Sequence, residues 1–349
     1  VRDFINNEIR PKEDQYFLDV GVAGSRFEFT QNMLDIISDL KKKAISKNLW
    51  NFWLNDSKEG HGLTTVEYAY LAEEMGKCRL GAEIFNCSAP DTGNMEVLKR
   101  YGSQRHKELW LKPLLNGEIR SAYCMTEPDV ASSDATNISL KAESHNGHYI
   151  LNGEKWWISG AGDPRCKVYI VLAKTGNSKE NKHRNHSMFV IPSDTVGIKI
   201  LRPMQVYGHD DAPHGHMHIS FKDVKVNRED LLLDEEGKGF EIAQGRLGPG
   251  RIHHCMRAIG QAEFALELMC NRALTRTAFG KKVSELGANY DIIANSRIEI
   301  EMARLLCLKA AWMMDNFDSK TAAPWISKIK VIAPQVALRV VDEAIQLYG

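Results

Sequence analysis

One stretch of this sequence concentrates hydroxyl groups around a single proline. Tyr123–Asp134 reads YCMTEPDVASSD, and its hydroxyls come from Tyr123, Thr126, Ser132 and Ser133. The stretch has neither the spacing of metal ligands nor a nucleophile beside a base, so covalent and metal-dependent catalysis are not indicated. Its hydroxyls and main-chain amides are instead suited to binding the polar edge of a ligand.

A second stretch places aromatic rings beside a small hydroxyl residue. Lys155–Ser159 reads KWWIS, and in a strand one of the two adjacent indoles is expected to face the core and the other outward. An indole can cover one face of a flat ring while hydroxyls and amides bind its edge. Together the two stretches predict a site for a flat, hydrogen-bonding heterocycle such as a flavin.

Two arginine-containing segments are candidates for binding phosphate groups. Gly245–Arg251 reads GRLGPGR, which lacks the preceding strand and the spacing of a dinucleotide fingerprint. We interpret it as a helix start that admits a ligand, with Arg251 placed to bind a phosphate. An ordinary loop with a surface arginine is the alternative. Arg276 and Phe279 follow an amphipathic stretch and could bind a pyrophosphate and an adenine.

The titratable side chains of this region do not predict a metal site or a general base. His214, His216 and His218 alternate and could share one face of a strand. No cysteine, glutamate or second cluster accompanies them at metal-ligand spacing, so no metal is predicted. Glu127 precedes a proline and is expected to brace its own turn. No carboxylate in this part of the sequence stands out as a general base.

The elements that must position these residues fall into three regions. Residues 1–119 carry helical apolar stripes, residues 120–230 carry short β-branched runs between turn residues, and helical stripes return over residues 240–349. In the middle region, Tyr149–Ile158 is predicted to form a hairpin, because Asn152-Gly153 suits a two-residue turn with positive φ.

The last region predicts long helices. Its apolar residues recur three or four positions apart, a pattern typical of a four-helix bundle and of subunit contacts. Pro334 lies inside the final stripe. We expect it to kink that helix or to mark a late start, because an interior proline costs about 3 kcal/mol.

Composition narrows the classes of function. The chain of 349 residues has 45 Lys+Arg and 45 Asp+Glu, and a chain of zero formal net charge has no overall field that would attract nucleic acid. Seven cysteines without CxxC spacing favour a reducing compartment. No apolar run approaches the ~20 residues of a transmembrane helix. The sequence opens at Val1, so a removed targeting peptide is neither claimed nor excluded.

Four motifs follow one another along the chain: WLKPLLNGEIRSAYCMTEP at Trp110–Pro128, KWWIS at Lys155–Ser159, RTAFGKK at Arg276–Lys282 and AIQLYG at Ala344–Gly349. With the helical first region, they resemble the acyl-CoA dehydrogenase family over nearly the whole chain. The wordings TEPDVASSDATNI and GRLGPGRIHH are most similar to the branch that is fused in some eukaryotes to an aminoglycoside-phosphotransferase-like kinase domain.

The resemblance implies a mainly α fold with a central β domain. An N-terminal helical domain would span residues 1–119, and a small β-barrel or sandwich would span residues 120–230. A C-terminal four-helix bundle would span residues 240–349 and would be incomplete at its C-terminal end.

The resemblance also implies FAD, a dimer or tetramer, and a set of site residues. The isoalloxazine would be contacted by two groups of residues, Tyr123, Met125, Thr126, Ser132 and Ser133 in the first and Trp157, Ile158 and Ser159 in the second. Ser132 and Ser133 are alternatives for one position. The FAD of a neighbouring subunit would be bound by Arg276, Phe279, Gln346 and Gly349. The acyl-CoA would be bound by Ser133, Gly248, Pro249, Gly250 and Arg251.

The implied reaction is α,β-dehydrogenation of an acyl-CoA thioester to trans-2-enoyl-CoA in fatty-acid oxidation. A carboxylate would remove the α-proton, flavin N5 would accept the hydride, and an electron-transfer flavoprotein would receive the electrons. Some family members place the base at the position of Gly250, which cannot accept a proton. We therefore expect the base just beyond Gly349.

Two other classes of function remain open at this point. One is an acyl-CoA oxidase or flavin monooxygenase on the same fold, and the other is a non-catalytic flavoprotein that binds acyl-CoA or DNA. The expected location is the mitochondrial matrix or peroxisome of a eukaryote, or the cytoplasm of a bacterium.

Overall fold

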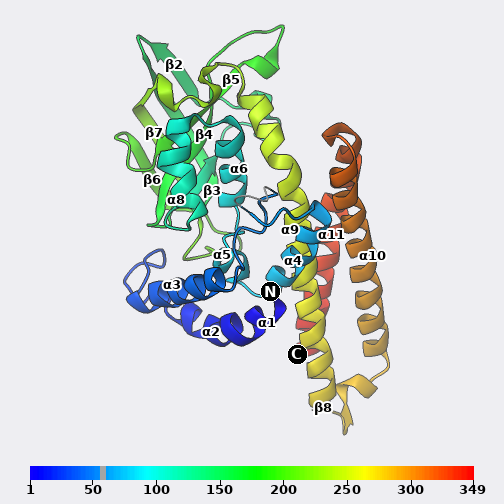
Figure 1. Ribbon diagram of the computed structural model, residues 1–349. Coiled ribbons are helices and arrows are strands. Elements are labelled where there is room, and N and C mark those ends of the chain that lie inside the picture. Colours follow the sequence, from blue (N-terminus) through cyan, green and yellow to red (C-terminus); the bar gives the residue numbers. More distant parts are fainter. Residues whose placement is uncertain (56–59) are drawn as a thin grey trace. The chain divides into compact units, whose positions relative to one another are not determined.

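The computed structural model describes residues 1–55 and 60–349, and the chain divides into two compact units (Figure 1). We call the first the helical unit; it consists of Val1–Asp14, Ser38–Cys87 and Gly248–Gly349. We call the second the sheet unit; it consists of Gln15–Ile37 and Ser88–Leu247. Each unit combines segments that are far apart in sequence. The predicted three-segment division of the chain stays a prediction.

Helices occur in both units. They are α1 (Arg2–Phe4), α2 (Arg10–Leu18), α3 (Gln31–Ser46), α4 (Thr65–Gly76), α5 (Gly81–Ile84), α6 (Asp91–Tyr101), α7 (Gln104–His106), α8 (Lys112–Leu115), α9 (Gly239–Thr275), α10 (Ala288–Asn316) and α11 (Ser319–Tyr348). Two π-helical turns, Ile5–Ile9 and Lys107–Leu111, continue α1 and α7. Among the described residues, none of the helices combines the length and the hydropathy that a bilayer crossing requires.

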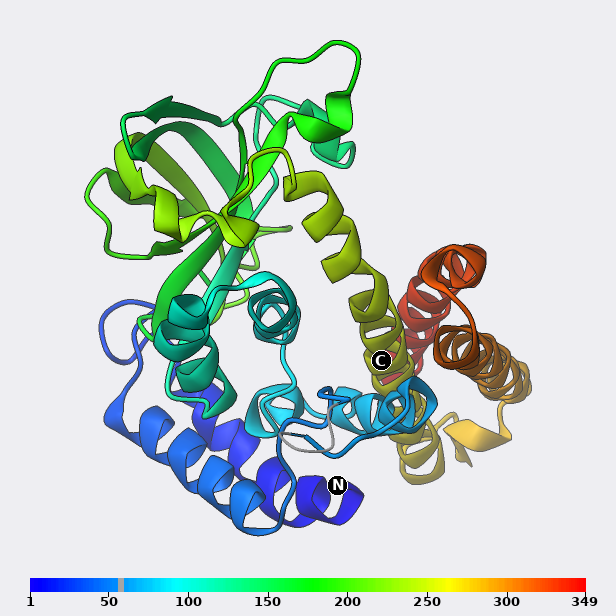
Figure 2. The same cartoon turned by 45° about the horizontal axis from the view of Figure 1, so that its top comes forward.

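The core of the helical unit lies between α4 and the three long helices α9, α10 and α11. Figures 1 and 2 show these long helices side by side, in yellow-green, brown and red. The apolar stripe expected on α9 is buried, because it packs against small side chains of the neighbouring helices, such as Ala303 of α10 and Ala333 of α11. The stripe consists of Met256, Ile259, Ala262, Leu266 and Met269.

Two glycines allow α4 and α9 to cross closely. A Cβ added at Gly76 would overlap the carbonyl oxygen of Arg257, and a Cβ added at Gly260 would overlap the carbonyl oxygen of Glu73. The two backbones therefore touch at a point where no larger residue fits.

The helix start predicted at Gly245–Arg251 is wrong, and of the two alternatives predicted for Pro334 the late start is excluded. Helix α9 begins at Gly239, so Gly245–Arg251 lies inside the helix and is not its start. Low intrinsic helix propensity of glycine and proline is overridden here by tertiary packing. Helix α11 runs through Pro334 from Ser319 to Tyr348, so this proline does not mark a late start.

A seven-stranded sheet forms the body of the sheet unit. Its strands are β1 (Arg120–Cys124), β2 (Lys141–His145), β3 (His148–Ser159), β4 (Cys166–Lys174), β5 (His186–Pro192), β6 (Ile198–Pro203) and β7 (His216–Asn227). They follow the order β1-β4-β2-β3-β7-β6, and β5 pairs with β4. Strand β1 runs parallel to β4, which brings the end of β1 beside residues that follow much later in the sequence.

The predicted hairpin turn at Asn152-Gly153 is wrong. Strand β3 continues through both residues, and the tight turn lies between β2 and β3, at Asn146-Gly147. Of the two Asn-Gly pairs at residues 146–147 and 152–153, only the first forms the turn, where Gly147 has φ +80°. A Cβ added at Gly153 would lie only 3.0 Å from the Leu140 Cα, so the lack of a side chain at Gly153 allows the backbone at Leu140 to approach closely.

Candidate functional site

The hydroxyl-rich stretch begins at the end of β1 and continues as a loop. Thr126 is held against β3, because its Oγ1 donates to the carbonyl oxygen of Trp156 (2.6 Å) and its own carbonyl accepts from the Trp156 N–H (3.0 Å). Tyr123 is part-buried, and its phenolic oxygen has no hydrogen-bond partner in the described part of the chain. Burial raises the pKa of Tyr123 to about 12, so its hydroxyl stays protonated and can donate.

The structure distinguishes the two adjacent serines of the loop. Ser132 is buried, where its Oγ accepts from the Glu127 N–H (2.8 Å) and donates to the Val130 carbonyl (3.1 Å). Ser133 is exposed. The hydroxyl of Ser132 is thus committed to the shape of the loop, whereas that of Ser133 is available to a ligand.

A buried ion pair joins the two stretches. Lys155 is fully buried, and its Nζ donates to Glu127 Oε1 (2.8 Å) and to the carbonyls of Met125 (2.9 Å) and Leu172 (2.7 Å). Glu127 also accepts from the Leu140 N–H (2.9 Å). Burial raises the pKa of Glu127, but the Lys155 ammonium outweighs burial and the net shift is downward. Glu127 is therefore an ionised brace and not a free base, but contrary to the prediction its carboxylate binds Lys155, Ser139 and Leu140 rather than its own turn.

A β-bulge sets the direction of the two indoles. Between Lys155 and Ile158, β3 has one residue more than the facing stretch of β7, and Trp157 has φ +55°. Strict alternation is lost at such a bulge. The prediction that one indole faces the core is wrong, because Trp156 and Trp157 are both part-exposed. Ile158 is the residue that enters the core.

The histidine-rich segment supports the hydroxyl of Ser159. Its Oγ lies 2.8 Å from His216 Nδ1, and His216 Nε2 lies 3.5 Å from Asp211 Oδ2. The hydrogen bond from His216 lowers the pKa of Asp211, so that carboxylate is ionised. His218 instead contacts Glu154 (2.7 Å). No cluster of three potential metal ligands occurs among residues 1–55 and 60–349.

In the helical unit, Arg276 and the end of α11 come together. Arg276 donates to the carbonyl of Tyr348, and a Cβ on Gly349 would overlap the guanidinium. Phe279 occupies the turn of a small hairpin formed by β8 (Thr277–Ala278) and β9 (Lys281–Lys282), with φ +53°. Phe279 is 96% exposed, so its ring is accessible to a ligand or to another chain. Gln346 is also exposed, on the last turn of α11.

The glycine run contributes backbone of α9. Gly248, Pro249, Gly250 and Arg251 are all helical. Open space surrounds the position that a Cβ of Gly250 would occupy, whereas Arg251 is part-buried. The run belongs to the helical unit and the hydroxyl-rich loop to the sheet unit.

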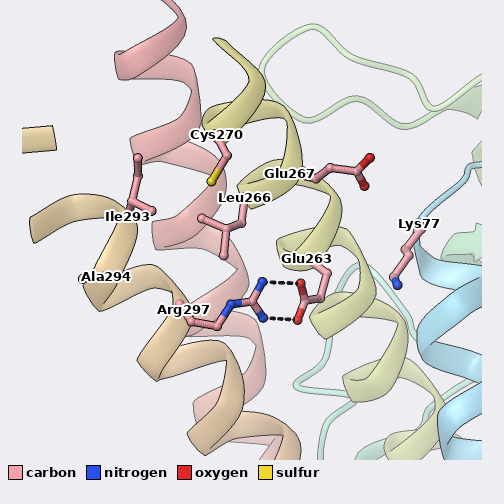
Figure 3. A pocket seen from close by; sticks show the side chains of 8 residues that line it. All are labelled: Lys77, Glu263, Leu266, Glu267, Cys270, Ile293, Ala294 and Arg297. Carbon is pink, nitrogen blue, oxygen red and sulfur yellow. Dashed lines mark hydrogen bonds and ion pairs between the residues drawn. The ribbon is translucent and has the colours of Figure 1, made fainter. Parts of the chain in front are cut away.

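A cavity of about 570 Å³ in the helical unit is not the predicted site (Figure 3). It lies between α9 and α10, and the ion pair of Glu263 with Arg297 (2.5 and 2.9 Å) borders it. None of the predicted site residues lines it. Its lining residues are Lys77, Glu263, Leu266, Glu267, Cys270, Ile293, Ala294 and Arg297.

The residues of the sheet unit fit the polar edge of a flavin. An unpartnered phenol at Tyr123, a free hydroxyl at Ser133 and part-exposed indoles at Trp156 and Trp157 offer donors and an apolar surface within one braced framework. Sequence reasoning missed the role of Lys155 and of the Asp211–His216 support. A lysine beside two tryptophans in a strand was the available signal, since a buried lysine needs an acidic partner.

Family models match three consecutive parts of the chain. They are described as the N-terminal domain (residues 1–118), the middle domain (residues 122–224) and the C-terminal domain (residues 237–349) of acyl-CoA dehydrogenases. These matches cover nearly the whole chain, and they confirm the predicted family and fold class.

Individual proteins agree with the family models. Acyl-CoA dehydrogenase family member 10 of Mus musculus is 53% identical over 90% of this chain and 30% of its own length, and family member 11 of Homo sapiens is 52% identical over 90% and 40%. The chain thus spans less than half the length of these relatives. It covers 76% of the probable acyl-CoA dehydrogenase FadE2 of Mycobacterium tuberculosis, which is 50% identical over 90% of this chain.

Solved structures share the fold. A protein of Mycobacterium abscessus assigned as an acyl-CoA dehydrogenase superposes with a TM-score of 0.93 at 47% identity, covering 100% of this chain and 86% of that one. Butyryl-CoA dehydrogenase of Megasphaera elsdenii gives a TM-score of 0.79 at 28% identity, covering 100% and 87%. By sequence and by fold, the chain belongs to the acyl-CoA dehydrogenase family.

Proposed function

We propose that this protein catalyses FAD-dependent α,β-dehydrogenation of acyl-CoA thioesters to trans-2-enoyl-CoA, within fatty-acid oxidation. The observation that carries the proposal is the buried Lys155–Glu127 pair, which fixes the hydroxyl-rich loop to the strand of the two indoles. A binding site for a flat ring requires such rigid placement of donors that approach from two separate segments.

When bound, FAD would supply the acceptor for a hydride from the substrate. The chain would hold it through Tyr123, Met125, Thr126, Ser133 and Trp157–Ser159. The part-exposed indoles would exclude water from the ring, which would strengthen the hydrogen bonds to the thioester carbonyl oxygen of the substrate. Ser132 supports this binding indirectly, since its hydroxyl is used within the loop.

The substrate would lie along the glycine run of α9. The open space at Gly250 admits a ligand close to the helix, and Arg251 supplies a cation for a phosphate of CoA. The α-proton would be removed by a carboxylate that follows Gly349 in the full protein.

The proposed assembly is a homodimer or homotetramer with FAD shared across a subunit interface. The exposed ring of Phe279 supports it, as do exposed apolar residues on α10 and α11, including Met302, Leu305, Leu338 and Ile345. Apolar stripes of this size on long helices are typical of subunit contacts. Arg276, Phe279, Gln346 and Gly349 would then contact the FAD of the neighbour, and an electron-transfer flavoprotein would accept the electrons.

The proposal is tested by product analysis of the full-length, FAD-loaded protein with a panel of saturated acyl-CoAs. We expect the trans-2-enoyl-CoA product with electron-transfer flavoprotein as acceptor and little hydrogen peroxide in air. Peroxide formed in proportion to product would instead indicate an oxidase. Binding of acyl-CoA without any product, in the presence of either acceptor, would overturn the proposal.

A further inference from the structure

An arginine of the sheet unit carries a charge that its protein surroundings do not balance. Arg246 lies on α9, and its guanidinium carbon is 3.8 Å from the centre of the Tyr123 ring. Its Nε donates to Asn94 Oδ1 (3.1 Å) and its Nη2 to the Pro90 carbonyl (3.3 Å). All of these partners are neutral.

No carboxylate among the described residues forms an ion pair with Arg246. The two acidic side chains that influence it are already engaged, because Asp91 pairs with Arg120 (2.5 Å) and Glu96 pairs with Arg100 (2.6 Å). Desolvation lowers the pKa of Arg246, yet a guanidinium remains protonated under all ordinary conditions. A part-buried cation with only neutral partners is costly unless an anion completes it.

The structure makes room for this guanidinium. A Cβ at Gly93 of α6 would lie 3.0 Å from Arg246 Cζ and 3.1 Å from its Nε, so any larger residue there would displace the group. On the other side, the Tyr123 ring supports it by a cation–π contact. The guanidinium is therefore seated between a glycine and an aromatic ring, in a fixed orientation.

Donors remain available beside this seat. The Nη1 of Arg246 has no partner within the described chain, and the buried Tyr123 phenol has none either. Tyr123 lies near the end of β1, in the stretch that would bind the flavin, and Gly248–Arg251, which would bind the substrate, follow Arg246 in sequence on α9. Both unsatisfied donors belong to the sheet unit.

We propose that Arg246, supported by Tyr123, is a specificity-determining residue that binds an anionic oxygen group on the acyl chain of the substrate. The substrate class is an acyl-CoA whose acyl chain carries such a group, for example a second carboxylate. This inference rests on the proposed function, because it assumes that the acyl chain enters beside the flavin. An unsubstituted chain would leave the guanidinium facing methylene groups, whereas an anion would satisfy it with charge-assisted hydrogen bonds.

The test compares pairs of CoA thioesters of equal chain length, one unsubstituted and one ending in a carboxylate, with the full-length, FAD-loaded protein. Affinity is measured by calorimetry and kcat/KM by loss of flavin absorbance. At the best chain length we expect the carboxylate thioester to be preferred by about 10- to 100-fold, the range for a charge-assisted hydrogen bond. In Arg246→Gln that preference should fall to about 1, and in Arg246→Lys it should be intermediate because lysine lacks the planar fork.

Two controls separate this role from a structural one. Arg184→Gln removes an exposed arginine of the same unit that pairs with Glu235, and it should keep the wild-type preference. Gly93→Ala keeps the charge of Arg246 but displaces it, and it should lose the preference; this variant decides the question if Arg246→Gln does not fold.

Several outcomes would overturn the inference. The first is a wild-type protein that does not prefer the carboxylate thioester at any chain length. The second is a preference for the carboxylate thioester that survives Arg246→Gln. The third is an equal loss of affinity for both thioesters and for free CoA in Arg246→Gln, which would show that Arg246 binds an anionic group of CoA. If the proposed function itself were wrong, neither thioester would bleach the flavin. Calorimetry would still show whether Arg246 discriminates between the two thioesters, so the two failures can be distinguished.

Discussion

At the scale of single residues, the candidate site depends on Lys155 and Glu127 more than on the side chains that face the ligand. Lys155 contacts the loop at Met125 and Glu127 and also the carbonyl of Leu172 on β4. It thereby joins two backbone segments, the loop and β4, to its own strand β3. A buried charge in such a place is tolerated only while its partner is present.

Replacement of Lys155 by methionine should therefore destabilise the sheet unit and weaken FAD binding. Leaving Glu127 buried without its cation is expected to cost about 3–5 kcal/mol in the free energy of unfolding. The measurement is chemical denaturation together with the FAD content of the purified protein. Lys225→Met, at an exposed position of β7, should behave like the wild type. The double variant Lys155→Met/Glu127→Gln should recover part of the loss; no recovery would argue against the ion pair as the cause.

The two serines of the loop should respond to substitution in opposite ways. Ser132→Ala removes the acceptor for the Glu127 N–H and should lower the free energy of unfolding by about 1–3 kcal/mol, the cost of an unsatisfied buried donor. Ser133→Ala should change stability by less than about 0.5 kcal/mol, as at other exposed positions. It should instead weaken ligand binding, measured by titration of FAD and acyl-CoA. If Ser133→Ala lowered the free energy of unfolding and Ser132→Ala weakened only ligand binding, the roles assigned to the two serines would be exchanged.

Asp210 gives the loop of the histidine segment a pH-dependent anchor. Arg26 donates two hydrogen bonds to it (2.6 and 2.9 Å), and mainly for this reason the pKa of Asp210 is lowered to about 2. A carboxyl whose pKa is lower in the folded state stabilises the fold above its unfolded pKa, ~3.9, and loses that contribution as the pH falls toward 2.

The melting temperature of Asp210→Asn should accordingly fall below that of the wild type at pH 6, and the gap should narrow as the pH is lowered from about 4 toward 2. Thermal unfolding across this pH range measures the effect. A difference in melting temperature that does not change with pH would mean that the charge of Asp210 contributes nothing to the stability of the fold.

The residue scale also shows how far the site could be predicted. The hydroxyl-rich loop and the paired indoles followed from residue types and local spacing, whereas the partners of Glu127 did not, because Lys155 and Leu140 are distant in sequence. The difference between Ser132 and Ser133 did not, because it depends on which hydroxyl turns toward the Glu127 N–H. The support of Ser159 by His216 depends on the pairing of β3 with β7, which links residues distant in sequence.

At the scale of elements, the packing of α4 on α9 depends on glycine. Gly260→Ala should destabilise the helical unit by about 1–3 kcal/mol, as overpacking typically does, because its Cβ would overlap the Glu73 carbonyl. Gly287→Ala is the matched control, since open space surrounds its Cβ position and its φ is −47°. Chemical denaturation of both variants measures the difference. Equal stability would show that the helices can separate at no cost.

Element types were predictable from periodicity, whereas their boundaries were not. The apolar stripe of α9 and the short strands follow directly from spacing. The hairpin failed because Asn152-Gly153 and Asn146-Gly147 offer the same local signal, and only the approach of Leu140 explains why the first pair is not a turn. Helix α9 extends past its expected start because packing outweighs the poor helix propensity of its glycines.

At the scale of the whole molecule, segments distant in sequence are combined into each compact unit. Helix α4 joins a core made otherwise by α9, α10 and α11, although the 162 residues from 77 to 238 separate it from the first of them. Such a combination could not be derived from periodicity. The family resemblance did not predict it either, because it implied an N-terminal helical domain over residues 1–119 that is separate from the C-terminal bundle over residues 240–349.

The central claim is that the braced loop and the paired indoles bind FAD so that an acyl-CoA can reduce it. The most direct measurement is anaerobic titration of the full-length, FAD-loaded protein with saturated acyl-CoAs while flavin absorbance is followed. We predict that at least one thioester bleaches the flavin in proportion to the protein present, and that Lys155→Met, which is expected to bind less FAD, bleaches correspondingly less. A correctly folded protein that cannot be loaded with FAD, or whose flavin no acyl-CoA reduces, would contradict it.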